Sequence, residues 1–126
     1  MPKKVIVADD SAPVRDSLIA HLGRVCRMEG IDAEFDQAPD GAELVRMVLG
    51  GHYDLVFTDD QMPNVDGLSA ISQILESKNA IPIYMISPKN VGEGAIGLGA
   101  TGYFDKNGDA DVFQRGVLEV LKKYLK

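Results

Sequence analysis

Short apolar runs alternate with longer amphipathic stretches along the whole of this 126-residue chain. The runs are rich in β-branched and aromatic residues, which favour strands, and apolar residues recur at helical spacing in the stretches between them. We expect strands at residues 5–8, 31–35, 55–58, 81–86 and 103–104. We expect helices to begin near Ser11, Asp40, Gly67, Val91 and Asp109. Five such units in a row predict an α/β domain in which helices cover both faces of a parallel sheet.

The number of these units narrows the fold class further. Right-handed crossovers leave few topologies, and the flavodoxin-like, doubly wound sheet of order 2-1-3-4-5 is the commonest at this size. Residues 5–8 (VIVA) are continuously apolar and predict a strand buried on both faces, whereas residues 31–35 alternate and predict a less buried one. The chain length fits one domain, so we predict a single domain over residues 1–126.

The fourth predicted helix is the weakest of the five. Its sequence, VGEGAIGLGA at residues 91–100, holds Gly92, Gly94, Gly97 and Gly99. Each interior glycine costs a helix about 0.5–1 kcal/mol relative to alanine. We therefore expect this helix to be short, mobile or partly unwound, and a plain surface loop fits the pattern equally well.

Composition and charge restrict the function classes. The net charge of −6 argues against a nucleic-acid-binding module, because phosphate contacts need a basic face. Cys26 is the only cysteine, so it has no internal disulfide partner, and its place on an apolar helical stripe favours a small buried hydrophobe. No apolar run reaches the ~18 residues of a membrane span, and no signal-peptide core follows the amino terminus. We expect a reduced, cytoplasmic protein that does not insert into membranes.

Two pairs of aspartates follow predicted strands. The pair Asp9-Asp10 ends the first strand, and the pair Asp59-Asp60 ends the third. In a sheet of order 2-1-3-4-5 these two strands are neighbours, and ligands bind at their carboxyl ends, where the strand order reverses. Carboxylates that close repel one another unless a cation binds, and a hydrated all-oxygen site suits Mg²⁺. The sequence therefore predicts a magnesium site at this edge.

A hydroxyl and an amine should reach the same edge. Ser87 ends the fourth predicted strand and Lys106 ends the fifth. Phosphoryl transfer needs an oxygen nucleophile, a divalent ion, and cationic and hydrogen-bonding partners for the phosphoryl oxygens. An aspartate can itself be the nucleophile and form an aspartyl phosphate.

These segments together resemble the receiver domains of two-component response regulators, most closely the single-domain chemotaxis type. The matching stretches are VIVADDS, LVFTDDQMPNVDG, MIS and GYFDK, and each lies at a predicted strand end. The resemblance covers essentially the whole chain. It implies that Asp59 is the phospho-acceptor, because the family places the acceptor four residues before a proline and eight before a glycine. Pro63 and Gly67 select Asp59 over Asp60 on that spacing.

The resemblance also implies roles for the residues around the acceptor. Asp9 and Asp10 would bind Mg²⁺, Asp10 directly and Asp9 at least partly through water. Asp59 and the backbone carbonyl of Gln61 would be further metal ligands.

The remaining implied roles concern phosphoryl binding and switching. Lys106 would pair with Asp59 and with the phosphoryl oxygens. Ser87 would bond the phosphoryl group and move on activation, and the rotamer of Tyr103 would follow it.

Plainer interpretations apply to several of these residues. Asp60 is expected to be a solvated neighbour rather than a ligand, and Asp66 to cap the third helix. The plainer alternative for Tyr103 is an ordinary core aromatic. The two histidines, His21 and His52, have no partner at useful spacing and are expected to be surface or helix residues.

Two positions depart from the family pattern. Pro88 follows Ser87 where the family usually has a small residue whose N–H reaches a phosphoryl oxygen, and proline has no N–H. We expect weaker or slower phosphorylation, because a lost hydrogen bond to a charged group costs about 1.5–3 kcal/mol. Asn107 follows Lys106 where the family usually has proline in a cis peptide. A cis bond without proline costs roughly 2.5–4 kcal/mol, so we expect a trans bond and a turn at Asn107-Gly108.

The function implied is a receiver that takes a phosphoryl group from a sensor histidine kinase or phosphotransfer protein. It would bind a downstream protein through the face of the fourth helix, fifth strand and fifth helix. It would be no enzyme beyond its own phosphoryl transfer and autodephosphorylation. A phosphorylation-independent interaction module is the alternative that Pro88 and Asn107 favour. An aspartate-dependent phosphatase fits poorly, because that chemistry normally uses Asp-x-Asp and residues 59–61 read Asp-Asp-Gln.

Overall fold

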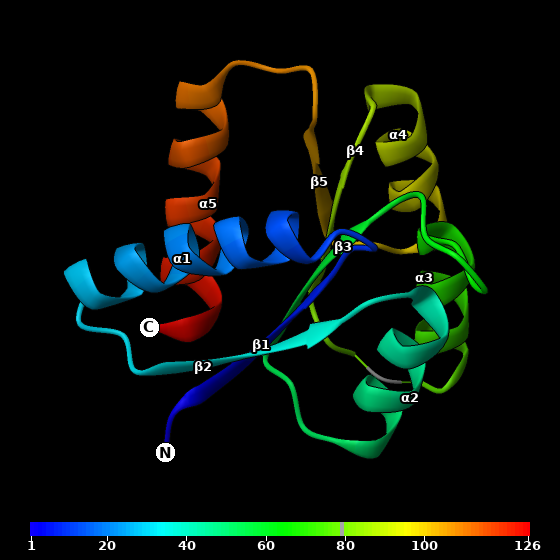
Figure 1. The fold of residues 1–126 in the computed structure, drawn as a ribbon, viewed down its shortest axis with the longest axis horizontal. Coiled ribbons are helices and arrows are strands. Elements are labelled where there is room, and N and C mark those ends of the chain that lie inside the picture. The colour runs from blue at the N-terminus through cyan, green and yellow to red at the C-terminus, as the bar shows by residue number, and fades with distance from the viewer. Residues whose placement is uncertain (79) are drawn as a thin grey trace.

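The computed structural model describes residues 1–78 and 80–126, in which five strands alternate with five helices (Figure 1). The strands are β1 (Lys3–Ala8), β2 (Ala33–Ala38), β3 (Leu55–Asp59), β4 (Ile83–Ser87) and β5 (Gly102–Asp105). The helices are α1 (Ala12–Met28), α2 (Gly41–Gly50), α3 (Gly67–Glu76), α4 (Lys89–Leu98) and α5 (Ala110–Leu125). Every predicted element is present, with boundaries that differ by a few residues.

The strands form one parallel sheet in the order β2-β1-β3-β4-β5. This is the flavodoxin-like order predicted from the sequence. Residues pair in register at the carboxyl ends, where Ala8 lies opposite Thr58 and Ser87 lies opposite Asp105. The ends of β1 and β3, which carry the acidic pairs, are therefore adjacent.

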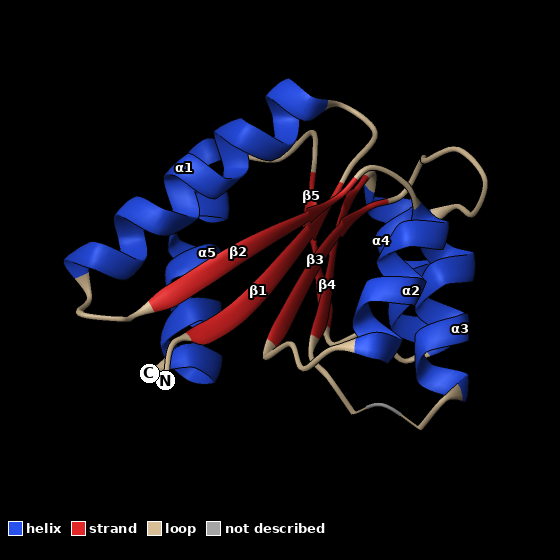
Figure 2. Cartoon of the chain, turned by 60° about the horizontal axis from the view of Figure 1, so that its bottom comes forward, coloured by secondary structure: helices blue, strands red, loops and turns tan. Residues whose placement is uncertain are grey.

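Helices cover both faces of the sheet, as Figure 2 shows. The helices α1 and α5 lie on one face, and α2, α3 and α4 lie on the other. Alternate residues of β1 enter two separate cores, Val5 and Val7 on the α1/α5 side and Ile6 and Ala8 on the opposite side. All four are buried, whereas β2 is mostly half-exposed, so the predicted difference between these strands is confirmed. Cys26 is buried as expected.

Side-chain caps fix the starts of four helices. Ser11, Asp40, Asp66 and Asp109 each accept a hydrogen bond from a backbone N–H in the first turn of the following helix. Asp66 is thus the cap of α3 that the sequence predicted. At α2 only half of a capping box forms: the N–H of Glu43 donates to Asp40, but the carboxylate of Glu43 accepts hydrogen bonds from Arg46.

The expectation of a partly unwound helix or a loop at residues 91–100 is wrong. The helix α4 is as long as α2 and α3 and ends at Gly99, whose φ of 111° is the left-handed conformation that glycine adopts readily. Tertiary packing overrides the low propensity, because Gly92 and Ala95 are buried against the sheet. Val112 of α5 is 60% exposed because it lies in the first turn of the helix, outside the core. Among the described helices, none has the length and apolarity to cross a membrane.

Candidate functional site

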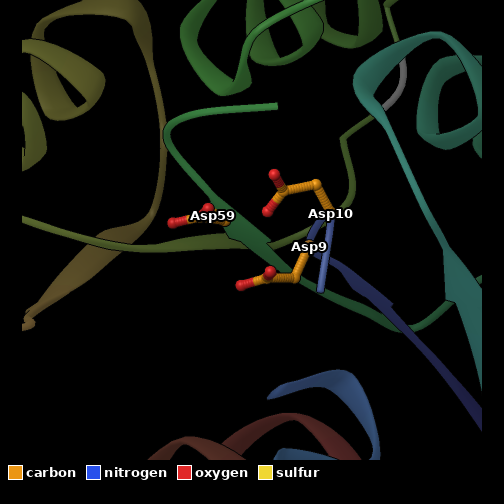
Figure 3. Close-up of side chains that lie close together, drawn as sticks. All are labelled: Asp9, Asp10 and Asp59. Carbon is orange, nitrogen blue, oxygen red and sulfur yellow. The ribbon is translucent and has the colours of Figure 1, made fainter. Parts of the chain in front are cut away.

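Three carboxylates from two strand ends meet at the carboxyl edge of the sheet (Figure 3). Asp9 and Asp10 follow β1, and Asp59 is the last residue of β3. One carboxylate oxygen from each lies within 4.8 Å of the other two. The convergence expected from strand order is therefore present, and an all-oxygen donor set of this kind fits Mg²⁺.

The loop that carries Asp9 and Asp10 is fixed by contacts that the sequence did not reveal. The Asp9 carboxylate accepts a hydrogen bond from the backbone N–H of Ser11 at 2.9 Å. The Arg15 guanidinium donates to the backbone carbonyl of Asp9 at 2.7 Å and to the side-chain oxygen of Gln37 at 2.8 Å. Arg15 thus ties the loop to the end of β2. In the sequence, the place of Arg15 in the first turn of the helix that follows the loop is the only signal that Arg15 could tie the loop to β2.

Lys106 reaches two neighbouring aspartates. Its ammonium contacts the Asp59 carboxylate and lies 3.1 Å from Oδ1 of Asp60. The contact with Asp59 is the one that the sequence predicted. The expectation of a solvated Asp60 is wrong, because this residue is only 7% exposed and pairs with the lysine. Asp60 is enclosed because the segment after β3 packs against the start of α3.

Gly67 allows this close packing. Its N–H donates to the carbonyl of Asp60 at 2.8 Å. A Cβ at position 67 would lie 2.2 Å from the carbonyl oxygen of Asp59 and 3.0 Å from Cα of Asp60, so no larger residue fits. Gly67, which the sequence singled out, thus lets the segment after Asp59 pack against the start of α3.

Burial and the neighbouring charges shift the pKa values of these aspartates. Burial raises the pKa of Asp59 to about 6, with Asp60 and Asp9 adding to the shift and Lys106 opposing it. Burial also raises the pKa of Asp9. Burial alone would raise the pKa of Asp60, but hydrogen bonds with Asp59 and Lys106 outweigh it and lower that pKa. Such perturbation is typical of functional sites, and a bound cation would relieve the repulsion that contributes to it.

Ser87 lies at the rim of this site, fully buried at the end of β4. Its hydroxyl donates to the carbonyl of Pro88 at 3.0 Å, and its own carbonyl accepts from the N–H of Lys106 at 2.9 Å. Pro88 caps α4 without a side-chain hydrogen bond. The Ser87 hydroxyl is thus bonded within its own segment.

The segment after Lys106 forms the expected turn. Within residues 1–78 and 80–126 every peptide bond is trans, including the one between Lys106 and Asn107. Asp105 closes the turn, because its carboxylate accepts from the N–H of Asn107 at 2.9 Å and its carbonyl accepts from Gly108 at 3.1 Å.

Tyr103 is half-buried and packs against the core that α4 covers. Its ring lies directly under Gly92, where a Cβ would come within 2.3 Å of the ring. The residue therefore has the packing of a core aromatic, and its switching role remains a prediction.

An apolar cavity of about 380 Å³ lies beside the acids on the α1/α5 side. It is lined by Asp9, Asp59 and Lys106 at one end and by apolar side chains such as Val14, Leu18 and Phe113 elsewhere. The cavity therefore reaches Asp59 from that side. Gln61 is exposed, and metal binding by its carbonyl remains a prediction.

Comparison with known proteins gives consistent relatives. A family model described as the response regulator receiver domain matches residues 5–117. The response regulator MprA of Mycobacterium sp. (strain KMS) is 32% identical over 109 residues, which is 84% of this chain and 45% of MprA. The chain thus spans less than half of this curated relative.

Two solved structures share the fold over nearly their whole length. The response regulator TrrA from Thermotoga maritima, in complex with Mg²⁺-BeF, is 28% identical with a TM-score of 0.77, covering 98% of this chain and 99% of that one. A chain of the CheX–CheY–BeF3–Mg²⁺ complex from Borrelia burgdorferi is 27% identical with a TM-score of 0.72, covering 100% of this chain and 92% of that one.

Proposed function

We propose, since this chain belongs to the response regulator receiver domain family of two-component signalling, that it accepts a phosphoryl group on Asp59. The donor is a phosphohistidine on a sensor kinase or phosphotransfer protein, and the protein works in the cytoplasm. The observation that carries the proposal is the placement of Asp59, which is joined to Asp9 and Asp10 on one side and to Lys106 on the other. The residues proposed as nucleophile, metal ligands and phosphoryl-binding cation thus come from the neighbouring carboxyl ends of β1, β3 and β5.

In the proposed step a carboxylate oxygen of Asp59 attacks the phosphorus in line with the histidine nitrogen. The P–N bond breaks, its electron pair returns to the imidazole, and a P–O bond forms to give an acyl phosphate. Lys106, already in contact with the carboxylate, binds a phosphoryl oxygen as it approaches.

Asp9, Asp10, Asp59 and the carbonyl of Gln61 are the proposed ligands of Mg²⁺. When bound, the ion would neutralise charge on the carboxylate and on the phosphoryl oxygens. The cluster of three carboxylates within 4.8 Å supports this set, and TrrA, 28% identical, has been solved with Mg²⁺-BeF. Arg15 holds the backbone between these ligands by bonding the carbonyl of Asp9.

The proposed output is a change in the face formed by α4, β5 and α5. The acyl phosphate draws Ser87 from the Pro88 carbonyl, and Tyr103 moves from beneath Gly92. A downstream protein binds the altered face. The Borrelia CheY chain, 27% identical, was solved with a partner protein, CheX, which supports a protein as the binding partner.

A phosphorylation-independent interaction module is the second candidate. The observation that favours it is the hydroxyl of Ser87, which is buried and already bonded to Pro88, a residue without an N–H. Beryllofluoride with Mg²⁺, followed by amide spectra, separates the two candidates. Shifts at Ser87 and Tyr103 support the switch, and unchanged spectra support the module.

Labelling with acetyl phosphate tests the acceptor. We expect Mg²⁺-dependent addition of one phosphoryl group to the wild-type protein and none to Asp59→Asn, measured by intact mass. Asp66→Asn is the control, because it removes one charge from the same segment while asparagine still caps α3. Unchanged labelling of Asp59→Asn contradicts the proposal.

A further inference from the structure

Asp60 is a second buried anion beside the proposed acceptor. Its side chain is 6% exposed, and its Oδ1 lies 3.1 Å from the ammonium of Lys106. The three carboxylates that gather at the proposed metal site are those of Asp9, Asp10 and Asp59. Asp60 instead faces the lysine, and its backbone is fixed by the hydrogen bond to Gly67. It therefore has a defined partner and a defined position.

One positive charge thus serves two carboxylates. The ammonium of Lys106 contacts Asp59 and Asp60 at once. A buried carboxylate that loses its partner becomes an uncompensated charge, which is strongly unfavourable. Asp60 is therefore expected to stay paired with Lys106 when a phosphoryl group arrives on Asp59. The negative charge of Asp60 would also repel that group.

We propose that Asp60 is a positioning residue that shares Lys106 with the phosphoryl group and thereby restrains phosphorylation of Asp59. The inference rests on the proposed function and adds a regulatory residue to it. In the proposed role Asp60 does not contact the reacting atoms, and it acts through Lys106. The level of phosphorylation is then set partly by the competition of two anions for one ammonium.

The experiment compares labelling by acetyl phosphate in wild type, Asp60→Asn, Asp60→Glu and Asp66→Asn. Asp60→Asn keeps the shape of the side chain and removes its charge. We expect it to be labelled about tenfold faster, the effect of restoring one charged hydrogen bond to the phosphoryl group. Asp60→Glu keeps the charge and should retain the slow rate. Asp66→Asn removes a charge from the same segment without touching Lys106 and should match wild type.

A spectroscopic measurement separates this role from a structural one. In protein labelled at lysine, the side-chain resonances of Lys106 should move in Asp60→Asn at constant pH without any phosphodonor, and should stay in place in Asp66→Asn. If Asp60→Asn fails to fold by circular dichroism, Asp60→Ser supplies a smaller neutral variant for the same comparison.

The outcomes distinguish the two proposals. Equal or slower labelling of the neutral variants, or unmoved Lys106 resonances, overturns the inference alone and leaves Asp59 as the acceptor. Acceleration by Asp66→Asn as large as that by Asp60→Asn also overturns it, since net charge would then explain the effect. Absence of labelling in every variant, wild type included, overturns the proposed function and this inference with it.

Discussion

Pro88 is the residue at which this chain departs most sharply from what phosphoryl binding needs. It supplies no N–H, and its carbonyl accepts both the hydroxyl of Ser87 at 3.0 Å and the N–H of Gly92 at 3.0 Å. Pro88 thus offers no backbone donor at this position and holds the Ser87 hydroxyl in a local hydrogen bond. Under the proposed function, both effects are expected to oppose an incoming phosphoryl group.

Replacement of Pro88 by alanine should therefore speed phosphorylation. The new N–H supplies a hydrogen bond to a charged oxygen, which is worth about 1.5–3 kcal/mol, so labelling by acetyl phosphate should rise by at least tenfold. Pro39→Ala is a suitable control because Pro39 lies in the exposed connection between β2 and α2. Equal rates and extents of labelling for wild type and Pro88→Ala would show that Pro88 does not slow phosphorylation.

Arg15 is a residue whose effect reaches the acids through the backbone. Arg15→Lys keeps the charge but loses the fork that joins the Asp9 carbonyl to Gln37. Because supporting contacts of this kind tune metal affinity, we expect Mg²⁺ to bind about tenfold more weakly. A Mg²⁺ titration followed by amide spectra measures this, with Arg24→Lys on the exposed side of α1 as control. Equal affinities in the two variants would show that Arg15 does not position the acids.

At the scale of elements, α4 combines low propensity with good packing. Gly92 is needed for contact with Tyr103, but a Cβ at Gly94 or Gly97 would meet no other group within 4 Å. Those two glycines lower the stability of the helix, and no close packing at either position requires a glycine. A helix held mainly by its buried side is suited to the change that the proposed switch requires of it.

Alanine at Gly94 and Gly97 should consequently stabilise the protein. We expect the double variant to raise the free energy of unfolding by about 1–2 kcal/mol, measured by urea denaturation, and to slow amide exchange in α4. Gly92→Ala is the matched control in the same helix, and it should destabilise, because its Cβ would lie 2.3 Å from the ring of Tyr103. A double variant no more stable than wild type would mean that the glycines do not limit the helix.

At the scale of the whole molecule, the sheet carries two different sets of polar groups. The carboxyl end gathers acids of perturbed pKa, while Tyr53, which lies just before β3, makes polar contacts with residues of β1 and β2. The hydroxyl of Tyr53 donates to the carboxylate of Asp36, midway along β2, at 2.6 Å, and the ammonium of Lys4 lies 5.1 Å from the centre of the Tyr53 ring. Burial, followed by the hydrogen bond to Asp36, raises the pKa of Tyr53 to about 12.

This contact predicts a pH-dependent stability. The folded state favours the neutral phenol, so its contribution is complete below the usual pKa of about 10 and is lost as pH rises toward 12. Tyr53→Phe should lower the free energy of unfolding by about 1 kcal/mol at neutral pH. The difference from wild type should shrink between pH 10 and pH 12 in urea denaturation series. A difference that stays constant over that range contradicts the assignment.

The order of elements, the sheet topology and the meeting of Asp9, Asp10 and Asp59 were predictable from the sequence. These follow from local periodicity and from the rule that neighbouring parallel strands bring their carboxyl ends together, neither of which needs detailed packing. Short-range caps such as Ser11 and Asp66 were predictable for the same reason.

Which side chains share a partner, and which helices form despite low propensity, depends on packing between distant parts of the chain. The burial of Asp60 and its pairing with Lys106 join residues 46 positions apart, and the contact of Arg15 with Gln37 joins residues 22 apart. No local sequence pattern indicates contacts between residues this far apart in the chain. The helix α4 likewise exists because buried surface at Gly92 and Ala95 outweighs its poor propensity, a balance set by the sheet beneath it.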